Sequence, residues 1–232
     1  MSLNGLIFAH RGSTRGPREN TIGAFRTAIE AGADGLELDV HVTRDGHLVV
    51  HHDDAIGGAL IAAMTGDAAH QLAQAAGFEL PELADVIELA RGRVRLDVEL
   101  KAAGCERAVV KLFADHGLSA ADVMVTSFNA KVVARVVEID ADVLTGLLVE
   151  QTTAAEAVDA YFECGADVLA PRHDMVDGEF LREMEREEVV LLPWTVNDPG
   201  SMRWLFKAPS VLGIITDRVA EAVRVRSEAP SA

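Results

Sequence analysis

Short apolar segments alternate with amphipathic segments of helical period along most of the chain, and this alternation limits the fold more than any other feature. The expected strands cover residues 6–9, 35–42, 94–100, 123–126, 143–149, 168–170, 189–195 and 212–216. Each strand leads to an expected helix, apart from a hairpin inserted after the second strand. Such alternation is typical of parallel strands joined by right-handed crossovers. Eight units therefore favour an α/β fold of the closed (β/α)8 TIM-barrel type over an open sheet.

The length of 232 residues fits a single barrel domain that covers residues 1–232. No linker, low-complexity tract or change of composition marks a boundary inside the chain. Residues 54–80 contain small residues, Gly57-Gly58 and a weak alanine-rich helical patch without convincing periodicity. We expect this short insertion to form a loop or cap over a site. The tail, residues 227–232, is expected to be disordered.

The formal net charge of −16 argues against nucleic acid as a partner, because a phosphate backbone needs a basic surface. No apolar run is long enough for stable membrane insertion, and the first residues lack the charged start of a secretory signal. Chemically interesting residues already begin at His10, which leaves no room for a leader. The expected location is the cytoplasm, with Cys105 and Cys164 as free thiols. Whether the chain forms a homo-oligomer is not decided by its sequence.

An acidic strand followed by a tight turn stands out between residues 37 and 53. Glu37 and Asp39 project to the same side of one strand, because side chains alternate between the two faces. The turn dipeptide Asp45-Gly46 folds the next strand back and brings a histidine toward the two carboxylates. A pair of carboxylates beside an imidazole suits a hard divalent cation with an acid or base next to it. Solvated charges on an edge strand are the alternative, but the flanking residues are apolar.

Polar residues collect where the expected strands end, and these ends share one face of a barrel. They are His10, Arg11, Glu37, Asp39, Glu99, Lys101, Ser127, Asn129, Arg172, His173, Trp194, Asn197 and Asp217. Glu99 with Glu37 and Asp39 completes a site for Mg²⁺ or Ca²⁺, because these ions prefer oxygen ligands. Zinc would prefer histidine and cysteine, for which no suitable spacing occurs. Glu99 and Lys101 could instead form a purely structural ion pair.

His10-Arg11 suits phosphate chemistry, because arginine offers a fixed fork of donors and histidine a proton near neutral pH. Taken alone, such a pair at the end of a strand is weak evidence of function. Trp194 follows an apolar strand and, taken alone, favours a place in the core. The carboxylate cluster nearby is what favours a functional interpretation of both.

Several motifs, in order along nearly the whole chain, closely resemble the glycerophosphodiester phosphodiesterase family. They are His10-Arg11-Gly12, Glu19-Asn20-Thr21, the stretch from Glu37 to Asp53, Asp97-Val98-Glu99-Leu100-Lys101, Trp194-Thr195-Val196-Asn197 and Ile215-Thr216-Asp217-Arg218. The resemblance implies a TIM barrel with a divalent cation held by Glu37, Asp39 and Glu99. It also implies His10 and His52 as an acid–base pair. Arg11 and Lys101 would bind the phosphate, and Trp194 would line the alcohol side.

The resemblance implies metal-dependent hydrolysis of a small-molecule glycerophosphodiester to an alcohol and sn-glycerol 3-phosphate. The cofactor would be Mg²⁺ or Ca²⁺, with Mn²⁺ as a third candidate. Three alternatives stay open at this point: a phospholipase-like lyase that forms a cyclic phosphate, enolate chemistry on the same barrel, and a non-catalytic metal-stabilised binding protein. In one loop the chain departs from the family pattern, since Arg18 stands between Pro17 and Glu19. The sequence does not determine the preferred alcohol.

Overall fold

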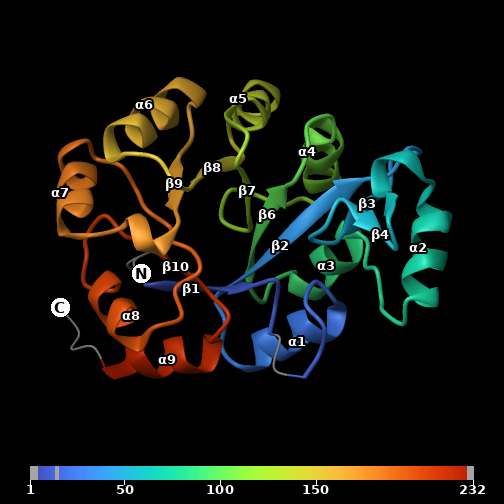
Figure 1. Ribbon diagram of the computed structural model, residues 1–232, viewed down its shortest axis with the longest axis horizontal. Coiled ribbons are helices and arrows are strands. Elements are labelled where there is room, and N and C mark those ends of the chain that lie inside the picture. The colour runs from blue at the N-terminus through green and yellow to red at the C-terminus, as the bar shows by residue number, and fades with distance from the viewer. Residues whose placement is uncertain (1–4, 14–15, 229–232) are drawn as a thin grey trace.

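The computed structural model describes residues 5–13 and 16–228, and it forms an α/β barrel with its helices on the outside (Figure 1). Its seven regular barrel strands are β1 (Leu6–His10), β2 (Gly35–Val42), β6 (Arg95–Leu100), β7 (Val123–Ser127), β8 (Leu144–Val149), β9 (Val168–Pro171) and β10 (Gly213–Thr216). They are parallel and lie in the order β10-β1-β2-β6-β7-β8-β9. The predicted TIM-barrel class is confirmed.

The segment predicted as the seventh strand, residues 189–195, is not a regular strand. It lies between β9 and β10 but pairs with them only through isolated bridges, Leu191 with both Leu169 and Val211, and Trp194 with Arg172. Pro193 supplies a physical reason, because proline has no amide hydrogen to donate to a ladder. The carbonyl oxygen of Pro193 still accepts a hydrogen bond from the amide of Ile215 at 2.9 Å. The barrel is thus closed by an irregular segment.

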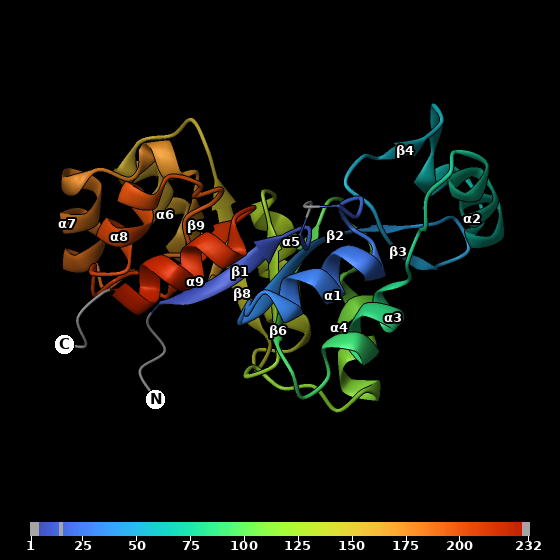
Figure 2. The same ribbon diagram turned by 90° about the horizontal axis from the view of Figure 1, so that it is seen from below.

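Helices follow the strands and cover the outside of the barrel (Figure 2). They are α1 (Ile22–Glu30), α3 (Leu83–Ala90), α4 (Glu106–Asp115), α5 (Ala130–Ile139), α6 (Ala154–Cys164), α7 (Gly178–Arg186), α8 (Pro199–Leu205) and α9 (Val219–Glu228). Side-chain caps begin several of them: Thr21 accepts from the amide of Ala24, and Thr153 forms a capping box with Glu156. The apolar faces of these helices bury Leu36 and Leu38 of β2 in the main core.

Alternation along the strands separates this outer core from a smaller one inside the barrel. Phe8, Met124, Leu148, Val168, Ala170, Leu192 and Ile215 form the smaller cluster. Gly35 makes room for the ring of Phe8, since a Cβ atom at residue 35 would lie 2.3 Å from it. On β2, Glu37 and Asp39 alternate with Leu36, Leu38 and Val40 of the main core, so the two acidic residues face the opposite way from the helices. The fold therefore directs Glu37 and Asp39 into the barrel.

The strand β3 (Leu48–Val50) is antiparallel to β2, which confirms the hairpin predicted at Asp45-Gly46. The insertion at residues 54–80 has more regular structure than its sequence indicates. It contains the short hairpin β4 (Ala55–Ile56) and β5 (Ala59–Leu60), a 3-10 turn η1 (Ile61–Ala63) and the helix α2 (Gly66–Ala75). Small apolar residues, Ala69 and Ala73, pack with Val49 and Ile56 in a separate cluster. Tertiary packing thus stabilises an alanine-rich helix with a weak pattern of its own. Figures 1 and 2 show α2 to one side of the barrel.

Of two further predictions, the one for the C-terminal tail is wrong at residues 227 and 228, and the one for the cysteines is confirmed. Helix α9 continues to Glu228, so Ser227 and Glu228 are helical rather than disordered, and the rest of the tail lies outside the described residues. Cys105 and Cys164 are buried free thiols, as predicted. Among the described residues, none of the helices combines the length and the apolar character that a membrane span requires.

Candidate active site

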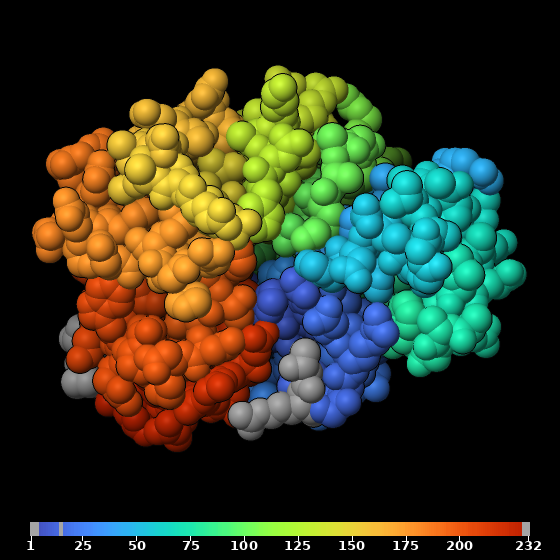
Figure 3. All heavy atoms as spheres, viewed as in Figure 1, coloured from blue at the N-terminus to red at the C-terminus, as the bar shows by residue number. Residues whose placement is uncertain are grey.

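A cavity of about 260 Å³ opens at the ends of the barrel strands. Its polar lining consists of His10, Arg11, Glu37, His52, Asp97, Glu99, Lys101, Thr126 and Glu150. Its apolar lining consists of Phe128, Leu148, Trp194 and Ile215. Figure 3 shows this face of the molecule hollowed near its middle, where blue, green and orange segments meet. Such a volume is close to the lower end of ligand pockets, about 300 Å³, and fits a small molecule.

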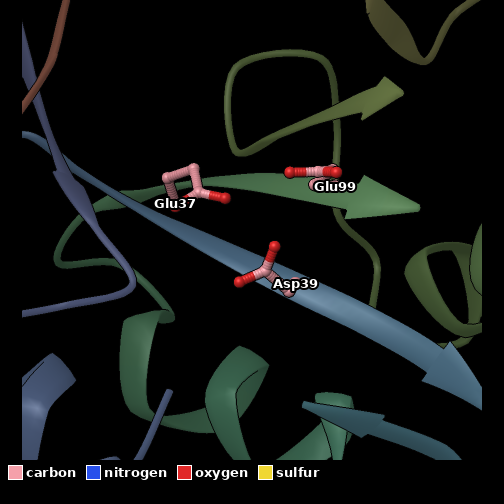
Figure 4. Close-up of side chains that lie close together, drawn as sticks. All are labelled: Glu37, Asp39 and Glu99. Carbon is pink, nitrogen blue, oxygen red and sulfur yellow. The ribbon is translucent and has the colours of Figure 1, made fainter. Parts of the chain in front are cut away.

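Three carboxylates from two neighbouring strands meet at this cavity: Glu37 and Glu99 line it, and the fully buried Asp39 lies next to them. Glu37 and Asp39 lie on β2, Glu99 lies on β6, and the strand register pairs Asp39 with Glu99. Each offers an oxygen atom, and these atoms all lie within 4.8 Å of one another. Figure 4 shows the three side chains directed toward a common space. The structure therefore brings together the three residues that the sequence singles out as metal ligands.

Burial and mutual repulsion act on the protonation of these carboxylates. Burial raises the pKa of Glu37 well above its ordinary value, and the charges of Asp39 and Glu99 raise it further. Burial likewise raises the pKa of Glu99, with the charge of Asp39 as the next cause. Burial would also raise the pKa of Asp39, but Lys101, Arg11 and a hydrogen bond from Asn20 together lower it. Asp39 is thus the carboxylate that stays ionised most readily.

Lys101 and Arg11 supply the positive charge nearest to the cluster. The Nζ atom of Lys101 lies 2.8 Å from Oε1 of Glu99 and 3.3 Å from Oδ1 of Asp39. The Nε atom of Arg11 lies 3.2 Å from Oδ2 of Asp39, and its backbone amide donates to Oε2 of Glu37 at 2.9 Å. Both basic side chains line the cavity. Glu99 and Lys101 therefore form an ion pair, and both residues also line the cavity.

The donor set fits a hard divalent cation. Asp39 is fully buried, and its Oδ1 atom has an ion pair with Lys101 at 3.3 Å but no hydrogen bond within the described part of the chain. A buried carboxylate oxygen without a hydrogen bond is costly unless another positive group approaches it. Carboxylate oxygens from three residues, with room for water in the cavity, are the ligands that Mg²⁺ and Ca²⁺ prefer. The residues present are thus compatible with such an ion.

The two predicted acid–base histidines both line the cavity, and each contacts an aspartate. The Nδ1 atom of His10 lies 2.8 Å from Oδ1 of Asp217, and the Nδ1 atom of His52 lies 2.8 Å from Oδ1 of Asp53. An ionised carboxylate can only accept, so each Nδ1 carries a hydrogen and each Nε2 is free to take a proton. His51, in contrast, is buried and stacks on the ring of Phe78 at 5.5 Å. It faces away from the cavity, as expected.

Several residues without an assigned role in the sequence prove to hold the site in place. The Nδ2 atom of Asn20 donates to Oδ2 of Asp39 at 2.7 Å, and Asn197 donates to Oδ2 of Asp217 at 2.7 Å. Glu19 accepts from Nη1 of Arg11 at 3.2 Å. Asn20 adopts a left-handed backbone conformation with φ of 54°. In the sequence, the motif Glu19-Asn20-Thr21 indicated that these residues matter. Only the folded structure shows that Asn20 contacts Asp39.

Asp97 is a further buried carboxylate beneath the cluster. Burial raises the pKa of Asp97 to about 7, against a hydrogen bond that Thr126 donates to its Oδ1 atom at 2.7 Å. Its other oxygen, Oδ2, has no hydrogen-bond partner within the described residues. Asp97 pairs with Glu37 across the strand register. The spacing of two residues places Asp97 on the same face as Glu99 and deeper in the strand, and the structure shows that it is fully buried.

Other polar residues at the strand ends have structural contacts instead. The hydroxyl of Ser127 donates to the carbonyl of Leu100 at 2.8 Å, and the side chain of Asn129 caps α5. Arg172 pairs with Asp174 at 2.7 Å and with Glu150 at 3.1 Å. Neither Arg172 nor its neighbour His173 lines the cavity. Only some of the polar residues predicted to share one face of the barrel therefore line the cavity.

The inserted Arg18 contacts the insertion rather than the cavity. Its guanidinium lies 3.9 Å from the centroid of the Phe78 ring, which in turn stacks on His51. The additional loop residue therefore connects the loop before α1 with the segment after α2. Arg18 and Phe78 do not line the cavity.

Known proteins resemble this chain over nearly its full length. A sequence profile of the glycerophosphoryl diester phosphodiesterase family matches residues 10–87 and 63–221. A glycerophosphodiester phosphodiesterase of Caldanaerobacter subterraneus is 33% identical over 235 residues, covering 91% of this chain and 93% of that protein. A solved glycerophosphodiester phosphodiesterase from Parabacteroides distasonis superposes with a TM-score of 0.84 at 26% identity, over 97% of both chains. An Oleispira antarctica phosphodiesterase, solved with its product sn-glycerol-3-phosphate, shares the fold with a TM-score of 0.84 at 21% identity over 98% of both chains.

Proposed function

The chain belongs to the glycerophosphoryl diester phosphodiesterase family, and we propose that it hydrolyses glycerophosphodiesters to an alcohol and sn-glycerol 3-phosphate. The observation that carries this proposal is the composition of one cavity. Glu37 and Glu99 line it beside the buried Asp39, and so do two histidines that contact aspartates and two basic side chains. A phosphodiester carries one negative charge that grows on its oxygens during hydrolysis, so it needs positive charge and proton transfer together.

Glu37, Asp39 and Glu99 would hold a divalent cation, with Mg²⁺ or Ca²⁺ as the leading candidates and Mn²⁺ as the third. When bound, such an ion supplies positive charge that stabilises the phosphate oxygens in the transition state. Its two positive charges also offset the repulsion that raises the pKa of Glu37 and of Glu99. The three carboxylates support a divalent cation at this position, and the restoration experiment described below identifies the ion.

Arg11 and Lys101 would bind the phosphate of the substrate. Both line the cavity and both are next to the carboxylate cluster, so their charges fall where the diester must lie. Burial would lower the pKa of Lys101, but the charges of Glu99 and Asp39 outweigh it and raise that pKa. Lys101 therefore stays charged at neutral pH. Arginine adds a planar fork of donors that matches phosphate oxygens.

His10 and His52 would transfer the protons of the reaction. Because Nδ1 of each ring donates to an aspartate, Nε2 is left to accept a proton from the nucleophile or to return one to the departing alcohol. Each contribution of this kind amounts to about 10²–10⁴-fold in rate. The nucleophile is water or the neighbouring hydroxyl of the glycerol, and the second choice would give a cyclic phosphate first. Trp194 would line the alcohol side of the cavity.

The test is a measurement of glycerol 3-phosphate release from a panel of glycerophosphodiesters that differ in their alcohol. The enzyme is first treated with EDTA, and Mg²⁺, Ca²⁺ or Mn²⁺ is then restored separately. We expect release only after a cation is restored. Phosphorus NMR of the products identifies a lyase, because only a lyase leaves a cyclic ester as the final species. No release from any diester with any of the three ions would refute the proposal.

A further inference from the structure

The wall of the cavity opposite the basic residues is aromatic and acidic. Phe128 is 44% exposed and meets Trp194 edge to face, with ring centroids 5.4 Å apart. The indole nitrogen of Trp194 donates to the carbonyl of Ala170 at 2.8 Å, which fixes the orientation of that ring. Leu148 and Glu150 complete this wall. Two aromatic rings beside an exposed carboxylate form a surface that favours a positively charged group.

We infer that Phe128, Leu148, Glu150 and Trp194 form a subsite for an alcohol that carries a cationic ammonium group. The inference rests on the function proposed above and specifies the substrate class. Aromatic faces attract a quaternary or protonated amine through the ring quadrupole, and the carboxylate of Glu150, which shares Arg172 with Asp174, adds negative charge that Arg172 neutralises only in part. The wall comes from the ends of β7 and β8 and from the irregular segment between β9 and β10, whereas the carboxylate cluster lies on β2 and β6.

The charges around Glu150 support a cationic occupant. Glu150 pairs with Arg172 at 3.1 Å, but Arg172 also forms two hydrogen bonds with Asp174, so two carboxylates share one guanidinium. A second, shallower groove continues outward from this wall and shares Phe128, Leu148 and Glu150 with the cavity. It is also lined by Glu156, and none of its lining residues in the described chain is basic. The field at this end of the cavity is therefore negative.

The two ends of the cavity thus match a zwitterionic diester. Arg11 and Lys101 face the position of the phosphate, and Glu150 faces the position of the ammonium group. A neutral alcohol of the same shape would gain the contacts with Phe128 and Leu148 but none of the charge-dependent attraction. The subsite should therefore separate two substrates that differ only in charge. It would do so mainly through kcat/KM, since the head group is bound in the ground state and in the transition state alike.

A competing exit lies on the other side, where His52, Asp53, Asp54 and Ala55 border an open depression next to Lys101. It also carries carboxylates, but its lining in the described residues contains no aromatic ring apart from histidines. Asp53 already contacts His52, and Lys101 would oppose a cation there. A substitution at Asp54 therefore distinguishes this route from the wall around Phe128.

The test compares two diesters of glycerol 3-phosphate: the choline ester and its uncharged 3,3-dimethylbutyl isostere, in which carbon replaces nitrogen. The measured quantity is the ratio of their kcat/KM values with the restoring cation present. We expect a ratio of about 10 in favour of the choline ester. Glu150→Gln should lower this ratio about threefold to fivefold. Phe128→Leu, at an exposed position that the fold does not need, should lower it about threefold.

Glu138→Gln is the matched control, because Glu138 is an exposed carboxylate that pairs with Arg135 at 2.7 Å on α5, away from the cavity. Its ratio should equal that of the unmodified enzyme. Equal kcat/KM for the two esters, with normal release of glycerol 3-phosphate, would overturn the subsite and leave the proposed function standing. A ratio that responds to Asp54→Asn and not to Glu150→Gln would overturn it as well. No turnover of either ester, while another diester of the panel releases glycerol 3-phosphate, would overturn the subsite alone, and no release from any diester would refute the proposed function as well.

Discussion

The Nδ1 atom of His10 lies 2.8 Å from Oδ1 of Asp217, although 207 positions separate the two residues in the sequence. The contact exists because β1 and β10 are parallel neighbours with Ala9 opposite Thr216. Burial would raise the pKa of Asp217, but hydrogen bonds with His10 and Asn197 lower it below its usual value. Asp217 is therefore ionised at neutral pH and accepts the Nδ1 hydrogen of His10, which leaves Nε2 for proton transfer.

Asp217→Asn should lower kcat by about 10- to 100-fold, because an amide no longer favours a single tautomer and orientation of His10. We expect KM to change little, since Asp217 does not line the cavity. Steady-state kinetics with a diester from the panel measures both constants. An unchanged kcat would show that the contact with Asp217 does not matter for the role of His10.

Asp53→Asn is the informative companion to that variant. Asp53 contacts His52 at the same distance of 2.8 Å, but its side chain is 72% exposed, compared with 37% for Asp217. Solvent screens an exposed pair, so the loss of kcat should be smaller than for Asp217→Asn. Circular dichroism should show no change of fold in either variant. A larger effect at Asp53 would reverse the ranking that exposure predicts.

His10→Ala and His52→Ala should each lower kcat by at least about 100-fold, because each removes a group that transfers a proton. Thermal unfolding should be nearly unchanged, since neither ring is part of the buried core. His47→Ala is the matched control, because His47 contacts the carboxylate of Glu82 at 2.7 Å and does not line the cavity. Near-normal rates in either His10→Ala or His52→Ala would contradict the acid–base assignment.

Binding of Mg²⁺ or Ca²⁺ should raise the melting temperature of EDTA-treated protein. An ion at 100 times its dissociation constant stabilises the folded state by about 2.7 kcal/mol. Because the pKa values of Glu37 and Glu99 are raised, protons compete with the ion, and the shift should be larger at pH 8 than at pH 6. Differential scanning fluorimetry measures it directly.

Glu99→Gln should greatly reduce this shift, while Glu88→Gln should retain it. Glu88 is an exposed glutamate on α3 that pairs with Arg91 at 2.9 Å and takes no part in the cluster. An equal shift in both variants would mean that the ion binds elsewhere. No shift with any divalent cation would count against a metal at Glu37, Asp39 and Glu99.

The metal-free protein should lose stability as the pH rises through neutrality. The pKa of Asp97 is raised to about 7, so the folded state binds more protons than the unfolded state between about pH 4 and pH 7. The free energy of unfolding must then fall with rising pH in that range. Asp97→Asn removes this titration and should flatten the decrease by on the order of 2–4 kcal/mol. Urea unfolding in EDTA from pH 5 to pH 8 measures the slope.

The sign of this effect offers its own check. At pH 8 Asp97→Asn should be more stable than the unmodified protein, because the buried charge is gone and the hydrogen bond from Thr126 is retained. Below about pH 4 the two should be similar, since Asp97 is then protonated in both the folded and the unfolded state. Parallel curves for the two proteins would mean that Asp97 is not the group that titrates.

The local sequence pattern was sufficient to predict the elements in which apolar residues recur with a clear period. The bounds of β2 agree with the expected range, residues 35–42, because the alternation of its side chains identifies this strand without tertiary information. For residues 189–195, in contrast, the local pattern predicted a regular strand that does not form. This apolar segment contains Pro193, and its position depends on isolated bridges with neighbouring segments. The helix α2 also depends on its neighbours, because alanines bury little area until Val49 covers them.

For the site, the sequence by itself determined the chemical types and the strand faces: Glu37 with Asp39, and Glu99 with Lys101, each two residues apart on a strand. The roles assigned to these residues and to His10, His52, Arg11 and Trp194 stay predictions. Only the tertiary structure decided which distant groups touch, as with Asn20 on Asp39, Asp217 on His10 and Phe128 on Trp194. The physical reason is that a period of two or 3.6 fixes the direction of a side chain along its own element. Barrel closure and register, set by packing across the whole chain, fix what that side chain meets.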